Sequence, residues 1–444
     1  MQISNLFTKK QQQVLSECWN NRKWKLMINY GAARAGKTFV DNFVFMYEVR
    51  HAAEIAKREN VQHPMYILAG VSSKSIANNI LNEIANTFGL TFKFDKHNSF
   101  TLKFPGLPAV KIVQTFTGSI SGLGAIRGMT SFGAYINEAS LANQSVFEEI
   151  RVRCSAPDAR VVCDTNPDTP THWLKVDYID KAKNDDNIIC NHFVMDDNTT
   201  LDPAYVASQK STTPSGMFYD RRILGLWVAG EGLVYQDFDK AKNVISLDDF
   251  HKRTANQSLS YYCGLDWGYE HKGVIVVLAD DENDNTYLIE EHTAQHHDIE
   301  YWVRVAKSIR AKYGWTIPIY CDSARPEYVQ RLIDEDFNAM NGYKSRLVGV
   351  ENCATKIKKR KFMLIEEAND KFLDEIYQYT WDEKTGMPAK VNDDVMDAFR
   401  YGIATRKWEL ENKQTDNRVE QTRIVTDAGL VNPAYGDYDM GLPQ

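Results

Sequence analysis

One loop limits what this chain can fold into more than any other feature of its sequence. Residues 31–38 read GAARAGKT and match the pattern GxxxxGK[ST] in full. The apolar segment 24–30 before the loop has the character of a strand, and the segment from 36 to about 56 that of a helix. In this context the backbone N–H groups of the loop curl around phosphate oxygens. The alternative interpretation is a glycine-rich turn with a solvated lysine.

Each functional residue of the loop has its own expected task. Gly31 and Gly36 let the backbone approach the phosphates, and Lys37 reaches the β- and γ-phosphate oxygens. The Thr38 hydroxyl is expected to ligate Mg²⁺ at the N-terminus of the helix. Arg34 can aim its guanidinium at the γ-phosphate, as an arginine finger in cis. The loop therefore predicts a site for ATP and Mg²⁺.

Strand-like and helix-like segments alternate through the first 200 residues. This alternation predicts an α/β fold with a mostly parallel sheet, helices on both faces and ligands at the carboxyl ends of the strands. The expected strands are 24–30, 65–70, 109–116, 132–138 and 159–164, the expected helices are 36–56, 72–88 and 141–154, and a hairpin is expected over 90–104.

The pattern lapses and then restarts in the second half of the chain. Helical pieces and turns over 201–256 are expected to form a connecting subdomain. Beyond it, strands are expected at 261–268, 274–280, 286–294, 317–322 and 346–352, with helices at 298–313, 326–337 and 355–369. The last 35 or so residues are polar and lack a sustained period, which indicates a flexible tail. The predicted domains are 1–200, 201–256, 257–408 and a tail over 409–444.

Composition excludes several classes of protein. No run approaches the roughly 18 apolar residues of a membrane span, and the seven cysteines lack the spacing of a disulfide framework or a zinc site. These features favour the cytoplasm. The formal charge of −7 disfavours electrostatic coating of nucleic acid but leaves room for a local basic groove. Five basic residues are candidates for such a groove, with a solvated helix face as the other interpretation: Lys356, Lys358, Lys359, Arg360 and Lys361.

ATP hydrolysis also needs acidic groups at the end of an apolar strand. The segment FGAYINEAS offers Asn137 and Glu138 there. Glu138 is the expected general base that polarises the attacking water, unless it is only a solvated residue at a strand end. Asn137 stands where an aspartate is usual, so it can only accept through its amide carbonyl or through a metal-bound water.

Two further segments are candidates for nucleotide contacts. Asp164, Thr165 and Asn166 end another strand where a γ-phosphate would lie, and they could sense its hydrolysis. A simple β-turn would explain the same residues. Upstream, Gln11 could offer its amide to the adenine edge, although a polar surface stretch explains it equally well.

Three acids occupy comparable places in the second half of the chain. Asp266 lies in the strand 261–268, Asp322 ends the strand 317–322, and Asp397 lies at a helix start. Converging carboxylates of this kind are typical of sites for divalent metals, which activate water and stabilise a leaving oxygen at a phosphodiester. Asp394, one helical turn before Asp397, could share a metal with it. Each acid alone could also be a turn or helix-start residue.

At this point the sequence resembles the large terminase subunit of tailed bacteriophages. The resemblance covers about residues 1–405. It rests on the order of GAARAGKT, AYINEA, DTNP followed by HW, LGLW with EGLVY, GLDWG, YCDSA and DDVMDAFRY. The family implies an ASCE-type P-loop ATPase domain followed by a nuclease domain with the ribonuclease H-like fold.

Carried over by residue, the resemblance implies the same roles as the motifs. Glu138 is the ATPase base, Arg34 acts near the γ-phosphate, and the segment 164–166 matches the coupling motif. Asp266, Asp322 and Asp397 hold the nuclease metals, Mg²⁺ or Mn²⁺. This chain departs from the family at Asn137, and at Asp394 where relatives often have histidine.

The resemblance also implies a function and partners. An ATP-driven translocase would feed double-stranded DNA through a portal protein into a procapsid, and its endonuclease would cut the concatemer. A small terminase subunit, a homo-oligomeric ring on the portal and the cytoplasm of an infected bacterial host belong to this implication, with no role for a membrane. Two alternatives are a helicase-nuclease of DNA repair or recombination and a chain whose second half only docks DNA.

Overall fold

Two units divide the chain. The computed structural model describes residues 6–21, 23–382, 384–421, 424–426 and 429–431. The first unit extends to Glu231 and includes residues 384–386, and the second begins at Gly232 and resumes at Met387. The segment 201–256, expected as a connecting subdomain, is thus shared between the units.

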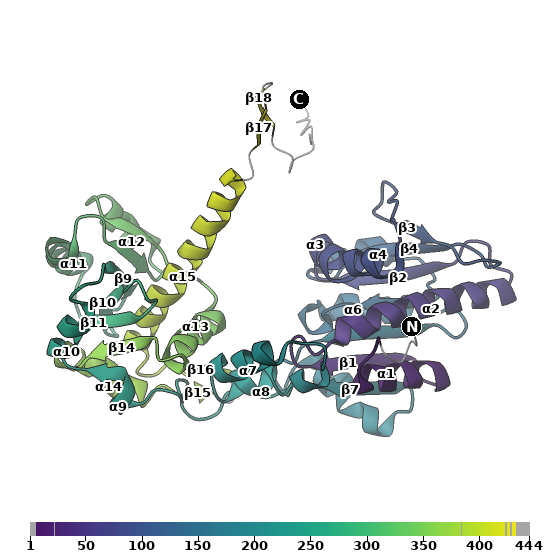
Figure 1. The fold of residues 1–444 in the computed structure, drawn as a ribbon, viewed down its shortest axis with the longest axis horizontal. Coiled ribbons are helices and arrows are strands. Elements are labelled where there is room, and N and C mark those ends of the chain that lie inside the picture. Colours follow the sequence, from purple (N-terminus) through teal and green to yellow (C-terminus); the bar gives the residue numbers. More distant parts are fainter. Residues whose placement is uncertain (1–5, 22, 383, 422–423, 427–428, 432–444) are drawn as a thin grey trace. The chain divides into compact units, whose positions relative to one another are not determined.

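A seven-stranded sheet forms the first unit, in the order β3-β4-β2-β5-β6-β1-β7 (Figure 1). All neighbouring strands are parallel except the edge pair of β3 and β4. The strands are β1 (Leu26–Gly31), β2 (Met65–Gly70), β3 (Phe100–Leu102), β4 (Val110–Phe116), β5 (Gly133–Ile136), β6 (Arg160–Thr165) and β7 (Ile188–Phe193). This arrangement confirms the predicted α/β fold with a mostly parallel sheet.

Helices supply the rest of the first unit. They are α1 (Lys9–Asn20), α2 (Lys37–Arg58), α3 (Ser73–Ile76), α4 (Asn82–Phe88), α5 (Leu123–Ile126), α6 (Gln144–Arg153), α7 (Pro203–Thr212) and α8 (Met217–Arg222), with a π-helical turn at Ala77–Leu81 that joins α3 to α4. A capping box between Thr8 and Gln11 starts α1.

The sheet of the first unit is buried on both faces. Along β1, Met27 packs into one hydrophobic cluster, whereas Leu26 and Ile28 pack into another. Successive side chains of a strand point to opposite faces, so a strand covered on both sides is apolar throughout. This explains why β1 has no polar alternation, and it leaves the strand ends as the places where polar groups reach solvent.

The second unit has a sheet of mixed direction, in the order β13-β12-β9-β10-β11-β14-β8. Strands β9, β10 and β11 pair antiparallel, and the strands on either side of them pair parallel. The strands are β8 (Val244–Ile245), β9 (Ser260–Asp266), β10 (Gly273–Asp280), β11 (Thr286–Ala294), β12 (Pro318–Cys321), β13 (Asn338–Asn341) and β14 (Phe362–Ile365).

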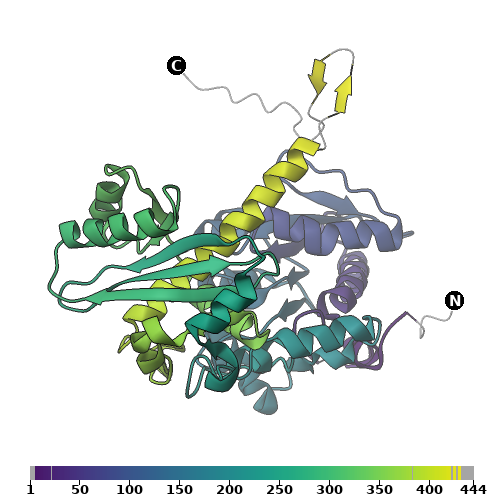
Figure 2. The ribbon, with the colours of Figure 1, turned by 60° about the vertical axis from the view of Figure 1, so that its left-hand side comes forward.

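One long helix packs across this second sheet. Figure 2 shows α15 (Asp394–Gln421, yellow) running along the strands, and it contacts β9, β10 and β12. The other helices are α9 (Lys240–Asn243), α10 (Leu247–Thr254), α11 (Ile299–Tyr313), α12 (Pro326–Ile333), α13 (Arg346–Lys358) and α14 (Asp370–Ile376), and two short strand pairs, Trp381–Asp382 with Met387–Pro388 and Ile424–Thr426 with Gly429–Val431, complete the described residues.

The predicted hairpin over 90–104 is wrong. Only β3 is a strand there, and it pairs with β4, where Phe100 lies opposite Ile112. The Asp95 carboxylate accepts the N–H groups of His97 and Ser99, which closes a turn at the point where the hairpin would need a ladder. Local hydrogen bonds from an aspartate side chain compete with strand pairing in this way.

Two elements near residue 350 are also wrong. Residues 346–352, expected as a strand, begin helix α13, and the expected helix 355–369 contains the end of α13 and strand β14. The buried positions of α13 recur at helical spacing: Gly349, Val350, Cys353, Ala354 and Ile357. Strand β14 is buried at all four positions because it pairs with β11 and β8, a tertiary context that short apolar runs do not encode.

The chain end differs from its expectation in part. Residues 409–421, assigned to a polar tail, continue α15. The remainder of the tail beyond 431 lies outside the described residues. Within the described part of the chain, none of the helices has both the length and the apolar composition that a bilayer span needs.

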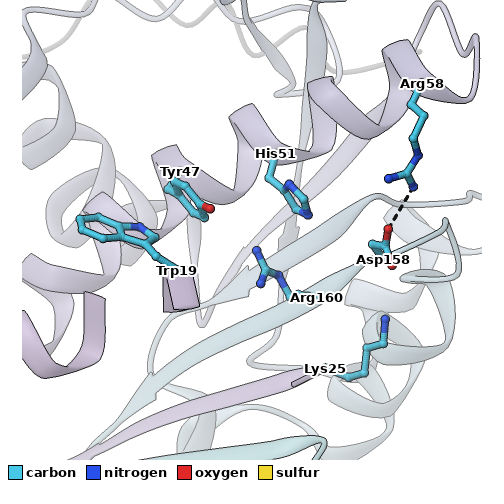
Figure 3. A pocket seen from close by; sticks show the side chains of 7 residues that line it. All are labelled: Trp19, Lys25, Tyr47, His51, Arg58, Asp158 and Arg160. Atoms are coloured by element: carbon cyan, nitrogen blue, oxygen red, sulfur yellow. Dashed lines mark hydrogen bonds and ion pairs between the residues drawn. The ribbon is translucent and has the colours of Figure 1, made fainter. Parts of the chain in front are cut away.

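A buried ion pair ties α2 to β6 in the first unit. Arg160 donates to both Glu48 oxygens, at 2.9 and 2.6 Å, and its guanidinium stacks over the Trp24 ring at 4.4 Å. The two side chains are 5% and 3% exposed. Figure 3 shows Arg160 at the base of a small pocket, with the ion pair of Arg58 and Asp158 at the pocket's rim.

We expect Arg160→Met to destabilise the first unit by about 3–5 kcal/mol, because it leaves the Glu48 carboxylate buried without its partner. The double variant Glu48→Leu/Arg160→Met should lose less than the single variant. Chemical denaturation of the full chain measures both. Arg58→Ala is the control: its pair with Asp158 is solvent-exposed, so its midpoint should stay close to the wild-type value.

Candidate functional site

The phosphate loop joins β1 to α2 through backbone conformations that only a few residues adopt. Gly31 and Gly36 have φ angles of 140° and 86°, and Arg34 has a φ of 59°. A Cβ on Gly31 would lie 2.0 Å from the Phe193 carbonyl oxygen, so the loop can follow this path only with glycine there. The sequence pattern around residues 31–38 therefore reflects both the turn and its close contact with β7.

The loop borders a cavity of about 520 Å³. Among the described residues, no side chain caps the N-terminus of α2, a helix of 22 residues. Its first N–H groups and its dipole are therefore available to an anion. The cavity is lined by Ala33, Arg34, Ala35, Gly36, Lys37, Thr38, Phe39, Asn79, Glu138, Asp164, Thr165, Asn166, Asn198 and Leu201.

Lys37 lies inside the loop with its ammonium held by three acceptors. Its Nζ donates to the carbonyl oxygens of Gly31 at 2.9 Å and Ala32 at 2.6 Å, and to Asn166 Oδ1 at 3.0 Å. Burial lowers the pKa of Lys37 to about 8, against the opposing effect of the Asp164 carboxylate. A buried cation with a depressed pKa is well suited to bind an incoming phosphate.

Asp164, near the end of β6, accepts four hydrogen bonds from groups around the cavity. They come from the Thr38 hydroxyl at 2.5 Å, the Asn137 amide at 2.8 Å, the Glu138 backbone N–H at 2.9 Å and the Tyr135 hydroxyl at 3.3 Å. The residue is 2% exposed. This carboxylate therefore connects the start of α2 with the end of β5.

Glu138 follows β5 directly and faces the same cavity. Its φ of 57° places it in the left-handed region, which turns the chain sharply at the strand end. Burial raises the pKa of its carboxyl, and the nearby Asp164 raises it further. A carboxylate with a raised pKa is a stronger base than a solvated one.

The cavity brings most of the predicted residues together, and Gln11 lies outside its lining. Gln11 Nε2 donates to the Gly36 carbonyl at 3.0 Å, and its Oε1 accepts the Thr8 N–H in the capping box. Its contact with an adenine edge stays a prediction. Arg34 is exposed at the cavity, and its carbonyl accepts from Asn198 Nδ2 at 2.7 Å.

The acids of the second unit lie on neighbouring strands. Strands β9 and β12 are parallel, with Leu265 opposite Cys321, so Asp266 and Asp322 follow at the same level. The Asp322 N–H continues the ladder by donating to the Leu265 carbonyl at 2.8 Å. Parallel pairing thus places the two carboxylates side by side at one edge of the sheet.

Helix α15 brings the other two acids to this edge through a close approach to β9. A Cβ on Gly264 would lie 2.0 Å from the Ala398 carbonyl oxygen and 2.7 Å from the Gly402 nitrogen. Glycine at 264 is what allows the helix backbone to touch the strand. Asp394 and Asp397 occupy the first turn of α15, next to this contact.

The four acids are close enough to repel one another. Burial raises the pKa of Asp266 well above its usual range, and Asp397, Asp322 and Asp394 raise it further. Burial also raises the pKa of Asp394, against the opposing charges of Lys272 and His271. Such an excess of buried negative charge favours a cation.

Internal donors occupy two of these carboxylates. Asp397 accepts from Arg400 Nε at 3.2 Å and lies 3.8 Å from Arg346, and Asp322 accepts from the Tyr401 hydroxyl at 2.9 Å. Within the described ranges, no three Asp, Glu, His or Cys side chains are placed to hold a metal ion together. The acids share one edge, but in this conformation they face their internal partners as well as each other.

Several contributing residues were not anticipated from the sequence. Glu375, on α14, is 3% exposed and accepts the Val395 N–H at the start of α15, at 2.8 Å. Burial raises the pKa of Glu375 to about 7. Asn79, in the π-helical turn, donates to Asn137 Oδ1 at 3.0 Å. Only tertiary contacts identify these residues, since nothing in their local sequence distinguishes them.

The basic cluster near residue 360 lies at the end of α13 and in the following turn. Lys356 pairs with Asp284 at 2.6 Å, and Lys358 pairs with Asp237 at 2.8 Å. Lys361 donates to the Asn283 carbonyl. Much of its charge is thus engaged by neighbouring groups of the same unit.

Comparison with known proteins agrees with these features. Residues 28–242 match the family model of the terminase large subunit, T4likevirus-type, N-terminal. None of the curated proteins matches the sequence.

Among solved structures, the large terminase of a thermophilic bacteriophage in complex with ATP-gamma-S is 26% identical, with a TM-score of 0.67, covering 89% of this chain and 98% of that chain. Another crystal form of the same phage's protein is 24% identical, with the same coverage and a TM-score of 0.70. The family model and the shared architecture agree with the order of motifs along the sequence. The chain belongs to the large terminase family.

Proposed function

We propose that this chain is the motor and nuclease subunit of viral DNA packaging. ATP hydrolysis in the first unit would drive double-stranded DNA into a procapsid, and the second unit would cut the concatemer. The observation that carries the proposal is the presence, in one chain of the large terminase family, of a phosphate loop facing Glu138 and of a separate edge where Asp266, Asp322 and Asp397 gather.

The first unit fits the binding and hydrolysis of ATP. The loop N–H groups and Lys37 would hold the phosphates, and the Thr38 hydroxyl would face Mg²⁺. Glu138, with its raised pKa, would take a proton from the attacking water. Arg34 would act on the γ-phosphate from its exposed position. The related terminase of the thermophilic bacteriophage has been solved with ADP and with ATP-gamma-S, which supports this assignment.

Asn166 would report the state of the nucleotide. Its side-chain oxygen accepts from the Lys37 ammonium at 3.0 Å. Phosphate oxygens compete for the same ammonium, so nucleotide binding and Asn166 contact would be coupled. This is how we propose that hydrolysis moves the segment 164–166.

The second unit fits a ribonuclease H-like nuclease. Its central antiparallel strands, parallel flanking strands and acids on β9, after β12 and on α15 support that assignment. Divalent cations, Mg²⁺ or Mn²⁺, would supply an activated water and stabilise the leaving oxygen at the phosphodiester. Asp266, Asp322 and Asp397 would hold them, and Asp394 would contribute to the same charge.

The proposed partners follow from the family. They are double-stranded DNA, a portal protein and a small terminase subunit, with several copies of this chain in a ring on the portal. The proposed location is the cytoplasm of the infected bacterial host.

The two activities should separate by mutation. Lys37→Ala should lower ATP turnover by ~100-fold or more, because it removes the ammonium aimed at the phosphates, while metal-dependent plasmid cleavage is kept. Asp266→Ala should do the reverse. A phosphate-release assay and plasmid cleavage on the full chain measure both. Lys74→Ala, an exposed lysine of the same unit, is the control. Unchanged turnover in Lys37→Ala would reject the motor site.

Nucleotide affinity should fall as the pH rises above about 8. The pKa of Lys37 is lowered to about 8, so the ammonium that attracts phosphate loses its proton in that range. The loss should approach tenfold per pH unit well above the pKa. Titration of ADP by calorimetry between pH 7 and about 9.5 measures it. Lys37→Arg keeps its charge over this range, so the pH dependence should disappear in that variant.

Gly264→Ala should impair cleavage and spare ATP turnover. The added methyl group collides with the α15 backbone and must move Asp397 relative to Asp266. A displacement of about 1 Å at reacting groups can cost ~100-fold in rate. Gly124→Ala is the matched control, since a Cβ there meets nothing within 4 Å. Wild-type cleavage by Gly264→Ala would show that the helix contact does not position the acids.

A further inference from the structure

We propose that Asp164 supplies the metal-binding carboxylate of the nucleotide site, in place of the acid that the chain lacks at position 137. The inference rests on the proposed ATPase function and assigns its Mg²⁺ site to a different strand. The phosphate loop alone offers the metal only the neutral Thr38 hydroxyl. A divalent cation bound with a nucleotide normally has a protein carboxylate nearby.

Asn137 cannot take this role in the observed structure. It is 1% exposed, and both ends of its amide are engaged within the protein. Its nitrogen donates to Asp164 Oδ1 at 2.8 Å, and its oxygen accepts from Asn79 Nδ2 at 3.0 Å. Because an ionised carboxylate only accepts, the nitrogen must be the end that faces Asp164. The amide carbonyl is therefore directed to Asn79.

Asp164 lies at the same level as Asn137 but one strand closer to the phosphate loop. Strand β6 pairs with β1 on one side, where Asp164 lies opposite Asn29. It pairs with β5 on the other side, where Cys163 lies opposite Ile136, so Asp164 is level with Asn137. A carboxylate moved from β5 to β6 thus stays at the same edge of the sheet and within the lining of the same cavity.

The contact between Thr38 and Asp164 prepares the hydroxyl for a cation. Thr38 Oγ1 lies 2.5 Å from Asp164 Oδ2, and since the carboxylate can only accept, the hydroxyl proton points to it. The lone pairs of the hydroxyl oxygen then face away from Asp164. This is the orientation that a hydroxyl needs when its oxygen is to ligate a metal.

The same carboxylate also positions the proposed base. Asp164 Oδ1 accepts the Glu138 backbone N–H at 2.9 Å, at the residue whose left-handed φ turns the chain. One side chain therefore holds the Thr38 hydroxyl at the start of α2 and the Glu138 backbone at the end of β5. A residue that only sensed the γ-phosphate would not need contacts with both.

The test compares three variants by metal binding rather than by turnover alone. Asp164→Asn removes the charge and keeps the shape, Asn137→Asp/Asp164→Asn moves the charge to the usual strand, and Asn137→Asp adds a charge without removing one. Electron paramagnetic resonance measures the affinity of Mn²⁺ for the full chain saturated with ADP, in the Asp266→Ala background so that the nuclease edge contributes little. Metal-free ADP affinity is measured alongside.

We expect Asp164→Asn to lower Mn²⁺ affinity by about 10–100-fold, the range found when a carboxylate next to a metal ligand is lost, with metal-free ADP affinity retained. The double variant should recover most of that loss. Wild-type Mn²⁺ affinity in Asp164→Asn, or equal losses in the single and double variants, would overturn the proposal.

Folding and failure of the parent proposal are read separately. Circular dichroism establishes that each variant is folded. If Asp164→Asn does not fold, the double variant, which keeps the wild-type charge, decides: near wild-type Mn²⁺ affinity supports the proposal and a loss of about tenfold or more overturns it. Lys37→Ala tests the nucleotide site itself, since unchanged ADP binding there would reject that site whatever Asp164 does.

Discussion

Parallel pairing of neighbouring strands is the constraint on which both sites depend. In the first unit β5, β6 and β1 run in the same direction, and in the second unit β9 and β12 do. Side chains that end such strands must lie at one edge, whatever their distance along the sequence. Asn137 and Asp164 meet in this way across 27 residues, and so do Asp266 and Asp322 across a whole helix. The helices then add the groups that the strands cannot supply.

Each edge concentrates charge of a kind that its ligand would neutralise. Burial lowers the pKa of Lys37 and raises that of Asp266, so both groups are held in surroundings that disfavour their charged forms. Phosphate oxygens relieve the first imbalance and divalent cations the second. The same physical cause, withdrawal from water next to like or unlike charges, therefore prepares one edge for an anion and the other for a cation.

The sequence was most informative where a motif and a strand signal coincide. The phosphate loop, the strands on both sides of Asp164 and Asp266, and the level of the acids follow from apolar runs and from the rules of parallel sheets. It was least informative where short apolar segments have two possible structures. Residues 346–352 and 362–365 are both short and apolar, and only the partners of β14 decide which of them is a strand.

Partners of the site residues were the other missing part. The hydrogen bonds of Asn79, Glu375 and Arg400 join segments whose spacing in the sequence carries no signal. The role of Asp164 as an acceptor for four donors likewise depends on side-chain placement in three dimensions. Motif reading placed it at the correct edge but could not count its contacts.

The internal donors at the nuclease edge have an energetic consequence. Because Arg400 and Tyr401 already serve Asp397 and Asp322, an arriving ion exchanges one set of companions for another and gains only the difference. Oxygen atoms of the polynucleotide backbone would then have to complete the coordination sphere. An edge built in this way stays idle until its own substrate arrives, which protects DNA that is merely passing by.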